Sequence, residues 1–192
     1  MPIAINGSGT LTGISTGGIS DTKAVADTAT PAGSVIQVVS NVFTTPTSFS
    51  IASGAAENFS TFQTSITPTF ASSKILLLGN LAVGHDGGQF LHVQLMVNGT
   101  FTADASKGNA PTNASRRCAH IGLNPPNNQA AGSMPINFLH DHDSTSAQTY
   151  HFQFSHTSGS TRNVYLNYGG STGNSNENGR YICTLTLLEI NE

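Results

Sequence analysis

The sequence predicts an all-β fold, an antiparallel β-sandwich of jelly-roll type that carries an extended N-terminal arm. From residue 34 onward, short runs rich in β-branched and aromatic residues alternate with Gly, Pro and Asn turn signals at intervals of roughly 8–12 residues. No stretch keeps a helical period long enough to compete with these runs. The final run, residues 179–190, alternates clearly and predicts a central strand that closes the fold.

Residues 1–33 differ from the rest of the chain. Their apolar residues are single and separated by Gly, Ser and Thr, so this segment cannot bury a core by itself. A disordered tail would have this composition. An arm that docks on a partner or winds around sister chains would have it too, and we favour this interpretation. The sequence therefore predicts an arm over residues 1–33 and a β-sandwich domain over residues 34–192.

About nine to eleven strands are expected in the β-domain. Residues 74–83 form a nearly continuous apolar run whose length suits a helix or a buried strand, and the strand-rich neighbours favour a strand. Asn98-Gly99 is a strong hairpin signal, because both central positions of a type I′ turn need positive φ. The expected strands cover residues 34–43, 48–51, 58–67, 74–83, 89–97, 100–103, 116–123, 134–140, 147–156, 165–166 and 179–190.

Alternate residues of the closing strand point to opposite faces. One face is apolar throughout and consists of Tyr181, Cys183, Leu185 and Leu187. The other face is mixed at first and becomes apolar at its end, with Leu188 and Ile190. A strand that is apolar on both faces is usually buried on both sides. The sequence therefore predicts a cover over Leu188 and Ile190, supplied by another sheet or by another subunit.

Composition argues against several classes of function. Charged residues make up only 9% of the chain, against roughly 25% in ordinary soluble domains, so hydroxyls and amides provide most of its polarity. The net charge of −3 and the lack of a basic stripe argue against nucleic-acid binding. No apolar run reaches the length of a membrane span, so membrane insertion is not expected. The N-terminus lacks the features of a signal peptide, which predicts a protein made in the cytoplasm.

Several stretches together resemble small virion proteins of tailed bacteriophages, especially marine and cyanobacterial phages, often described as tail-fibre or appendage proteins. The resemblance covers most of the chain and rests on the order and spacing of its motifs. These are INGSGTLTGI at 5–14, GSVIQVV at 33–39, ITP at 66–68 with SSKIL at 72–76, DSTSAQTY at 143–150, and GRY to LEI at 179–190.

The resemblance implies a homotrimer with an N-terminal segment that attaches to other virion proteins and a distal β-domain. It implies no catalytic residue. We expect a structural virion protein, a short trimeric tail fibre that contributes to attachment to the host surface and whose threefold axis is lined by Leu188 and Ile190. A capsid decoration or head-fibre protein without receptor binding is the alternative, and a polysaccharide-degrading enzyme is a third, less favoured one.

His140-Asp-His-Asp143 is the sharpest polar cluster, and it departs from the family pattern. His140 and His142 would share one face if their strand continued, and three chains around an axis would then offer six imidazoles to a transition metal. Carboxylates would favour Ca²⁺ instead. A polar strand end without any ion is the alternative that we favour, and no other cofactor is expected. His151 and His156 are expected on a solvated or subunit-facing strand edge.

The remaining polar residues suggest no enzyme. Neither a nucleophile elbow, a phosphate-binding glycine pattern nor a zinc-protease motif occurs. Cys118 and Cys183 could pair, but two reduced core thiols are favoured in a cytoplasmic product. Three loops rich in Asn, Ser and Gly are candidates to face a receptor and to hydrogen-bond a cell-surface glycan. Their residues of interest are Asn109, Asn127, Asn128, Asn174 and Asn176.

Overall fold

The computed structural model describes residues 30–86, 91–101, 120–123, 131–156, 159–169 and 179–192. The chain separates into two units, Met1–Pro31 and Ala32–Glu192, and all described strands belong to the second. Its eleven strands are β1 (Val35–Phe43), β2 (Thr47–Ile51), β3 (Ala56–Ile66), β4 (Lys74–His85), β5 (Leu91–Val97), β6 (Thr100–Phe101), β7 (His120–Leu123), β8 (Gly132–Asp141), β9 (Gln148–His156), β10 (Arg162–Leu166) and β11 (Cys183–Ile190).

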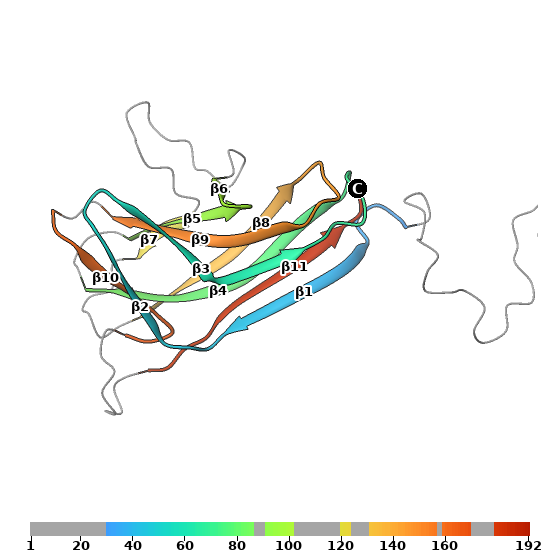
Figure 1. The fold of residues 1–192 in the computed structure, drawn as a ribbon. Helices are drawn as coiled ribbons and strands as arrows, with labels where there is room; N and C mark the ends of the chain where they lie inside the picture. The colour runs from blue at the N-terminus through green and yellow to red at the C-terminus, as the bar shows by residue number, and fades with distance from the viewer. Residues whose placement is uncertain (1–29, 87–90, 102–119, 124–130, 157–158, 170–178) are drawn as a thin grey trace, which may run out of the picture. The chain divides into compact units, whose positions relative to one another are not determined.

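The strands form two sheets in which every pairing is antiparallel (Figure 1). The first sheet has six strands in the order β1-β11-β4-β10-β2, with β8 on the other side of β4. The second has five strands in the order β3-β9-β5-β6, with β7 also paired to β5. The predicted all-β antiparallel sandwich is therefore confirmed. The described part of the chain contains no helix that could span a membrane.

The core lies between the two sheets and is rich in aromatic rings. Phe59 stacks on Phe49 with ring centroids 5.4 Å apart, and Phe62 stacks on Phe152 at 6.2 Å. Phe43 packs against both Phe59 and Phe62, so rings from β1, β2, β3 and β9 form one continuous cluster. Such pairs contribute beyond the area that they bury, which couples the two layers firmly.

Local sequence signals and structure agree at the β5–β6 hairpin. Asn98 and Gly99 both have positive φ, 52° and 76°, as a type I′ turn requires. The Asn98 side chain also accepts a hydrogen bond from the Thr149 backbone N–H at 2.9 Å and donates one to Gln148 at 3.0 Å. The turn is thereby tied to the start of β9.

The closing strand β11 occupies the interior position that the sequence predicts, between β1 and β4. Cys183, Leu185 and Leu187 are fully buried against the second sheet. Tyr181 departs from the prediction, because the strand begins only at Cys183 and the Tyr181 side chain is 40% exposed.

Glu189 is fully buried in β11. Its carboxylate accepts five hydrogen bonds, from Gln37 Nε2 at 2.6 Å, from the backbone N–H and the hydroxyl of Thr69 at 2.7 and 3.1 Å, from the Phe70 N–H at 3.1 Å and from Ser73 Oγ at 2.7 Å. Hydrogen bonds to an ionised acceptor are stronger than neutral ones. The carboxylate therefore joins β1, β11 and the connection between β3 and β4.

This environment sets the charge state of Glu189. Burial by itself would raise the pKa of the carboxyl, but the hydrogen bonds from Ser73, from Gln37 and from two backbone N–H groups outweigh it and lower the pKa below its ordinary value of 4.5. The native chain therefore binds fewer protons at Glu189 than the unfolded chain does in acid. The resulting stability is complete above the unfolded pKa and is lost as the pH falls through the folded pKa.

Gly79 lies where β4 and β11 approach closely. It pairs with Leu185, and a Cβ atom at Gly79 would stand 2.2 Å from the backbone oxygen of Thr184. The obstacle is backbone of a central strand, which cannot turn aside as a flexible side chain would. Only glycine fits this position without separating the two strands.

Gly79→Ala is expected to destabilise the fold by about 1–3 kcal/mol or more, because β11 must move away from β4. Chemical denaturation measures the loss. Gly159→Ala is the matched control, since a Cβ at Gly159 meets nothing within 4 Å. Equal stability of the two variants would contradict the close approach.

Glu189→Gln is expected to cost about 1.5–3 kcal/mol near neutral pH, because an amide cannot replace a carboxylate that accepts five hydrogen bonds. The stability of the wild type should fall as the pH drops below about 4.5. The variant should lack the part of this pH dependence that comes from Glu189. Urea unfolding over a pH series measures both effects. Glu57→Gln, at an exposed position of β3, is the control. If Glu189→Gln loses stability at acidic pH as the wild type does, Glu189 is not the source of this pH dependence.

Candidate functional site: an apolar sheet face and a pocket at its end

The outward side of β1, β11, β4 and β8 carries a central row of apolar residues among polar neighbours, and we call this side the apolar face. The strand register places Val38 beside Leu188, Leu188 beside Leu76, and Leu76 beside Leu139. This row crosses all four strands. Val38 and Leu139 are 57% and 48% exposed.

Neighbouring rows extend the apolar face in both directions. Val35 pairs with Ile190 on one side of the central row, and Val42 pairs with Thr184 nearer the other end. Leu78 lies between them on β4 and is also exposed. Most of the exposed large apolar side chains of the described residues therefore gather on one side of one sheet, where ordinary surfaces scatter them.

The outward side of the second sheet is different. Thr149 and Gln153 of β9 point outward there, with Gln94 of β5 and Ser65 and Asn58 of β3 beside them. These side chains hydrogen-bond one another, Gln153 to Asn58 at 2.9 Å and Ser65 to Thr149 at 2.7 Å. This part of the second sheet thus presents hydroxyls and amides, whereas the row from Val38 to Leu139 on the first sheet is apolar.

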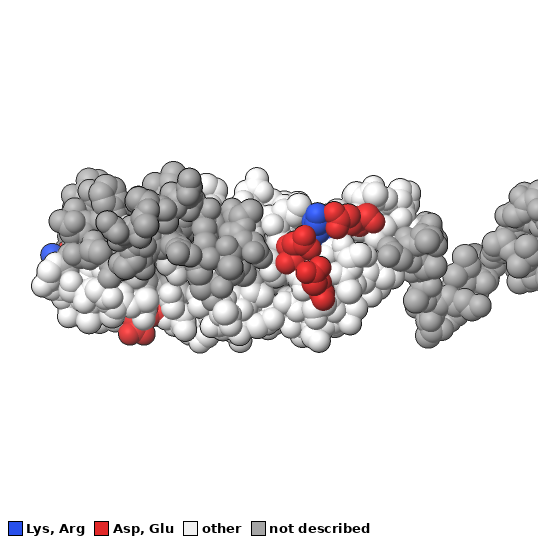
Figure 2. Space-filling model, turned by 90° about the horizontal axis from the view of Figure 1, so that it is seen from above, with Lys and Arg blue, Asp and Glu red and all other residues white. Residues whose placement is uncertain are grey.

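Charge on the apolar face is confined to one end. Lys74 pairs with Glu192 at 2.5 Å and lies opposite Asp141 in the strand register. The hydrogen bond that Lys74 Nζ donates to the Glu192 carboxylate raises the pKa of Lys74. On the face that Figure 2 shows, the visible charged residues gather in small groups.

Leu188 and Ile190, the predicted interface residues, lie on this face. Each is half-buried within one chain, because neighbouring side chains of β1 and β4 shield its flanks but not its outward end. Sequence alternation alone placed both residues on the correct side of the strand. Their contact with another subunit stays a prediction.

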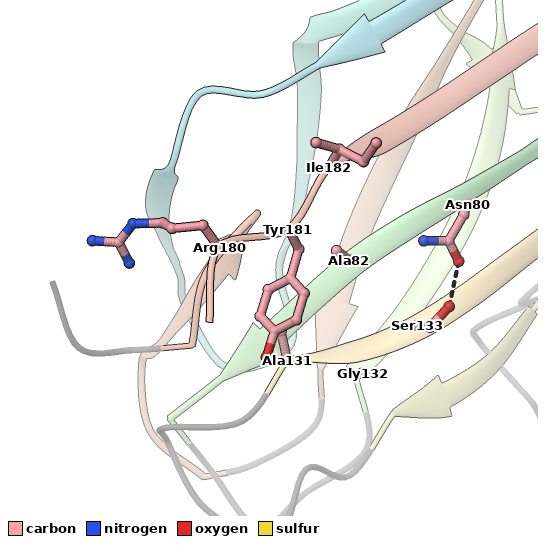
Figure 3. A pocket seen from close by; sticks show the side chains of 8 residues that line it. All are labelled: Asn80, Ala82, Ala131, Gly132, Ser133, Arg180, Tyr181 and Ile182. Carbon is pink, nitrogen blue, oxygen red and sulfur yellow. Dashed lines mark hydrogen bonds between the residues drawn. The ribbon is translucent and has the colours of Figure 1, made fainter. Parts of the chain in front are cut away.

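A pocket of about 370 Å³ opens at the opposite end of the sheet from Lys74. Its lining comes from the middle of β4, from the start of β8 and from the segment that precedes β11 (Figure 3). Asn80 and Ala82 belong to β4, and Tyr181 and Ile182 form a wall. Sequence reasoning did not find this pocket, since its lining comes from three distant segments.

The histidines of the predicted metal cluster are engaged inside the fold. His140 is buried, and its Nδ1 lies 2.8 Å from the Tyr150 hydroxyl. His142 Nδ1 accepts the Ser144 N–H at 3.2 Å, which leaves the proton on Nε2, 3.3 Å from Ser73 Oγ. No group of three or more His, Cys, Asp or Glu residues within the described ranges could hold a metal. Metal binding by His140 and His142 stays a prediction, and it would require breaking these contacts.

Ser73, His142 and Glu189 form a hydrogen-bonded chain without the order of a catalytic triad. The carboxylate contacts the serine and not the histidine, and Ser73 is fully buried. A nucleophilic serine needs access to substrate and a base oriented by the acid. This arrangement therefore serves to fix loops and offers no route to acyl transfer.

The expectation for His151 and His156 was wrong. β9 lies between β3 and β5 and is no sheet edge, and both side chains are buried. His156 Nε2 lies 2.8 Å from the Ile51 carbonyl oxygen, and burial lowers the pKa of His151. The sequence did contain a signal for this, because the alternating aromatic residues Tyr150, Phe152 and Phe154 of β9 are typical of a central strand.

Cys183 is a free thiol in the core, as favoured from the sequence. Its Sγ donates to Asn167 Oδ1 at 3.0 Å, and burial raises its pKa to about 11. Cys118, residues 1–29 of the predicted arm, and the proposed receptor-facing residues lie outside the described ranges. The latter are Asn109, Asn127, Asn128, Asn174 and Asn176.

Comparison with known proteins finds distant structural neighbours. No protein-family model and no curated protein matches the chain. A structure of the Gt strain of infectious bursal disease virus is 13% identical, with a TM-score of 0.43, over 82% of this chain and 39% of that chain. The VP2 subviral particle of infectious bursal disease virus is 13% identical, with a TM-score of 0.42, over 82% of this chain and 42% of that chain. The chain spans about two fifths of those chains.

Proposed function

We propose that this chain is a structural virion protein that assembles with copies of itself through the apolar face. One observation carries the proposal. The exposed large apolar residues of the described strands gather on the outward side of one sheet, whereas the other sheet presents hydroxyls and amides to water. A surface of this kind is typical of a face that is buried in an assembly.

The number of copies comes from the sequence. Its motifs resemble trimeric phage appendage proteins, and the central strand β11 offers Leu188 and Ile190 to a shared axis. Burying one such side chain stabilises an assembly by roughly 1.5–3 kcal/mol, and three chains repeat the gain. A homotrimer around this face accounts for both features.

The place in the particle is a finer part of the proposal. Gly33 donates its N–H to the Asn191 carbonyl at 2.7 Å, so the chain leaves for residues 1–32 beside the end of β11. The pocket lies toward the other end of the sheet. Attachment to other virion proteins through residues 1–33 suits a tail fibre in contact with a host. A capsid decoration or head fibre would use the same arm on a shell.

Leu188→Asp is expected to dissociate the assembly, because three carboxylates would meet in a dry interface. Native mass measurement of the purified protein should change from three chains to one. The thermal unfolding of the subunit itself should change less, since Leu188 is only half-buried within one chain.

Ser60→Asp is the matched control, on an exposed position of β3 in the other sheet, and should leave the mass unchanged. A monomeric wild type would disprove the assembly. A Leu188→Asp variant that keeps three chains and wild-type heat resistance would show that this face is not the interface.

Imaging of particles that carry a label after Glu192 separates tail from head. Label on the tail supports the fibre, and label on the shell supports decoration of the capsid. Deletion of residues 1–33 should give a soluble β-domain that no longer joins the particle. Particles that retain the truncated protein at normal copy number would disprove the role of the arm.

A further inference from the structure

The pocket beside Tyr181 lies at the end of the apolar face, where Asn80 pairs with Thr184, beyond the central row from Val38 to Leu139. Its hollow exists because small residues, Ala82, Ala131 and Gly132, line its floor. Tyr181 and Ile182 rise on one side and are 40% and 52% exposed. The volume of about 370 Å³ lies within the range of small-ligand sites.

The backbone of Tyr181 is tied to the neighbouring segment. The Tyr181 backbone N–H donates to the Asn167 carbonyl at 2.9 Å, and Asn167 itself is fixed by hydrogen bonds to the carbonyls of Phe43 and Thr45. A Cβ at Gly179 would stand 2.3 Å from the Tyr181 hydroxyl oxygen. Glycine at this position therefore allows the ring to fold back toward the pocket, and any other residue would displace it.

Asn80 faces the ring across the pocket. Its Oδ1 accepts the Ser133 hydroxyl at 2.5 Å, so the amide is oriented with its N–H₂ group on the other side. Figure 3 shows this nitrogen on the side of Tyr181. The pocket thus sets an N–H donor opposite an aromatic wall.

The lining residues that the structure describes are almost all uncharged. Arg180 is the one charged residue of the set, and its guanidinium lies 5.9 Å from the Tyr168 ring centroid and points away from the pocket in Figure 3. A ligand that suits these walls is uncharged, has one apolar face for the ring, and carries oxygens at its rim for the amide. A pyranose ring combines these properties.

We propose that this pocket binds one ring of a neutral saccharide, with Tyr181 as the stacking surface and Asn80 as the hydrogen-bond donor. Gly179 acts as a positioning residue for the ring. Every residue that carries this proposal belongs to one chain.

Ligand-observed NMR on the full chain tests the proposal with the methyl glycosides of glucose, galactose, mannose and N-acetylglucosamine. At least one should bind, with a Kd of about 1 mM, as suits a single ring in an open site. N-acetylneuraminic acid and a blocked tripeptide serve as the charged and the peptide probe, and both should bind more weakly.

Tyr181→Ala should weaken binding at least tenfold, Tyr181→Phe should retain most of it, and Gly179→Ala should weaken it by displacing the ring. Asn80→Asp keeps the acceptor for Ser133 but replaces the donor, and should weaken binding as well. Unchanged thermal unfolding shows that each variant is folded. The proposal is overturned if no glycoside binds, if Tyr181→Ala and Asn80→Asp bind as the wild type does, or if the tripeptide binds more tightly.

Discussion

The buried carboxylate of Glu189 is the constraint on which much of the first sheet depends. A charge without a cation is stable in the interior only if hydrogen bonds replace its lost hydration. Its five donors come from β1 and from the connection between β3 and β4, and Ser73 extends the network to His142 after β8. Misplacing any of these segments would leave the charge unsatisfied. The network therefore selects one register for the strands that form the apolar face.

That register gives β11 two functions at once. Its inward residues, such as Leu187, close the core, and its outward residues, such as Leu188, continue the row from Val38 to Leu139. Glu189 sits between Leu188 and Ile190 and points inward, so one polar anchor holds both apolar neighbours outward. The same strand alternation that buries the core thus builds the apolar face.

Much of this fold follows from local sequence. The turn at Asn98-Gly99 and the alternation of residues 183–188 are local signals, and the structure agrees with both. Glu189 looks like an ordinary exposed acid in sequence, because its partners lie 116–152 residues away. The pocket could not be predicted from the sequence for the same reason, since Ala82, Gly132 and Tyr181 come together only in the folded sheet. Contacts set by long-range register leave no mark on local periodicity.

A protein with few charges and an apolar face needs some feature that prevents its copies from associating in the wrong arrangement. Natural sheets discourage unwanted association with charged residues on exposed strands, and here Lys74 and Asp141 provide charge at only one end of the face. Polar side chains interrupt the apolar rows at Ser40 and Thr186, which hydrogen-bond each other at 2.9 Å and so need no partner from outside. If two copies pack so that their apolar rows are buried and their charged ends stay in water, every polar group keeps a partner. If the copies are shifted along the strands, Lys74 is buried. The face can therefore select one mode of assembly through the position of its few charges.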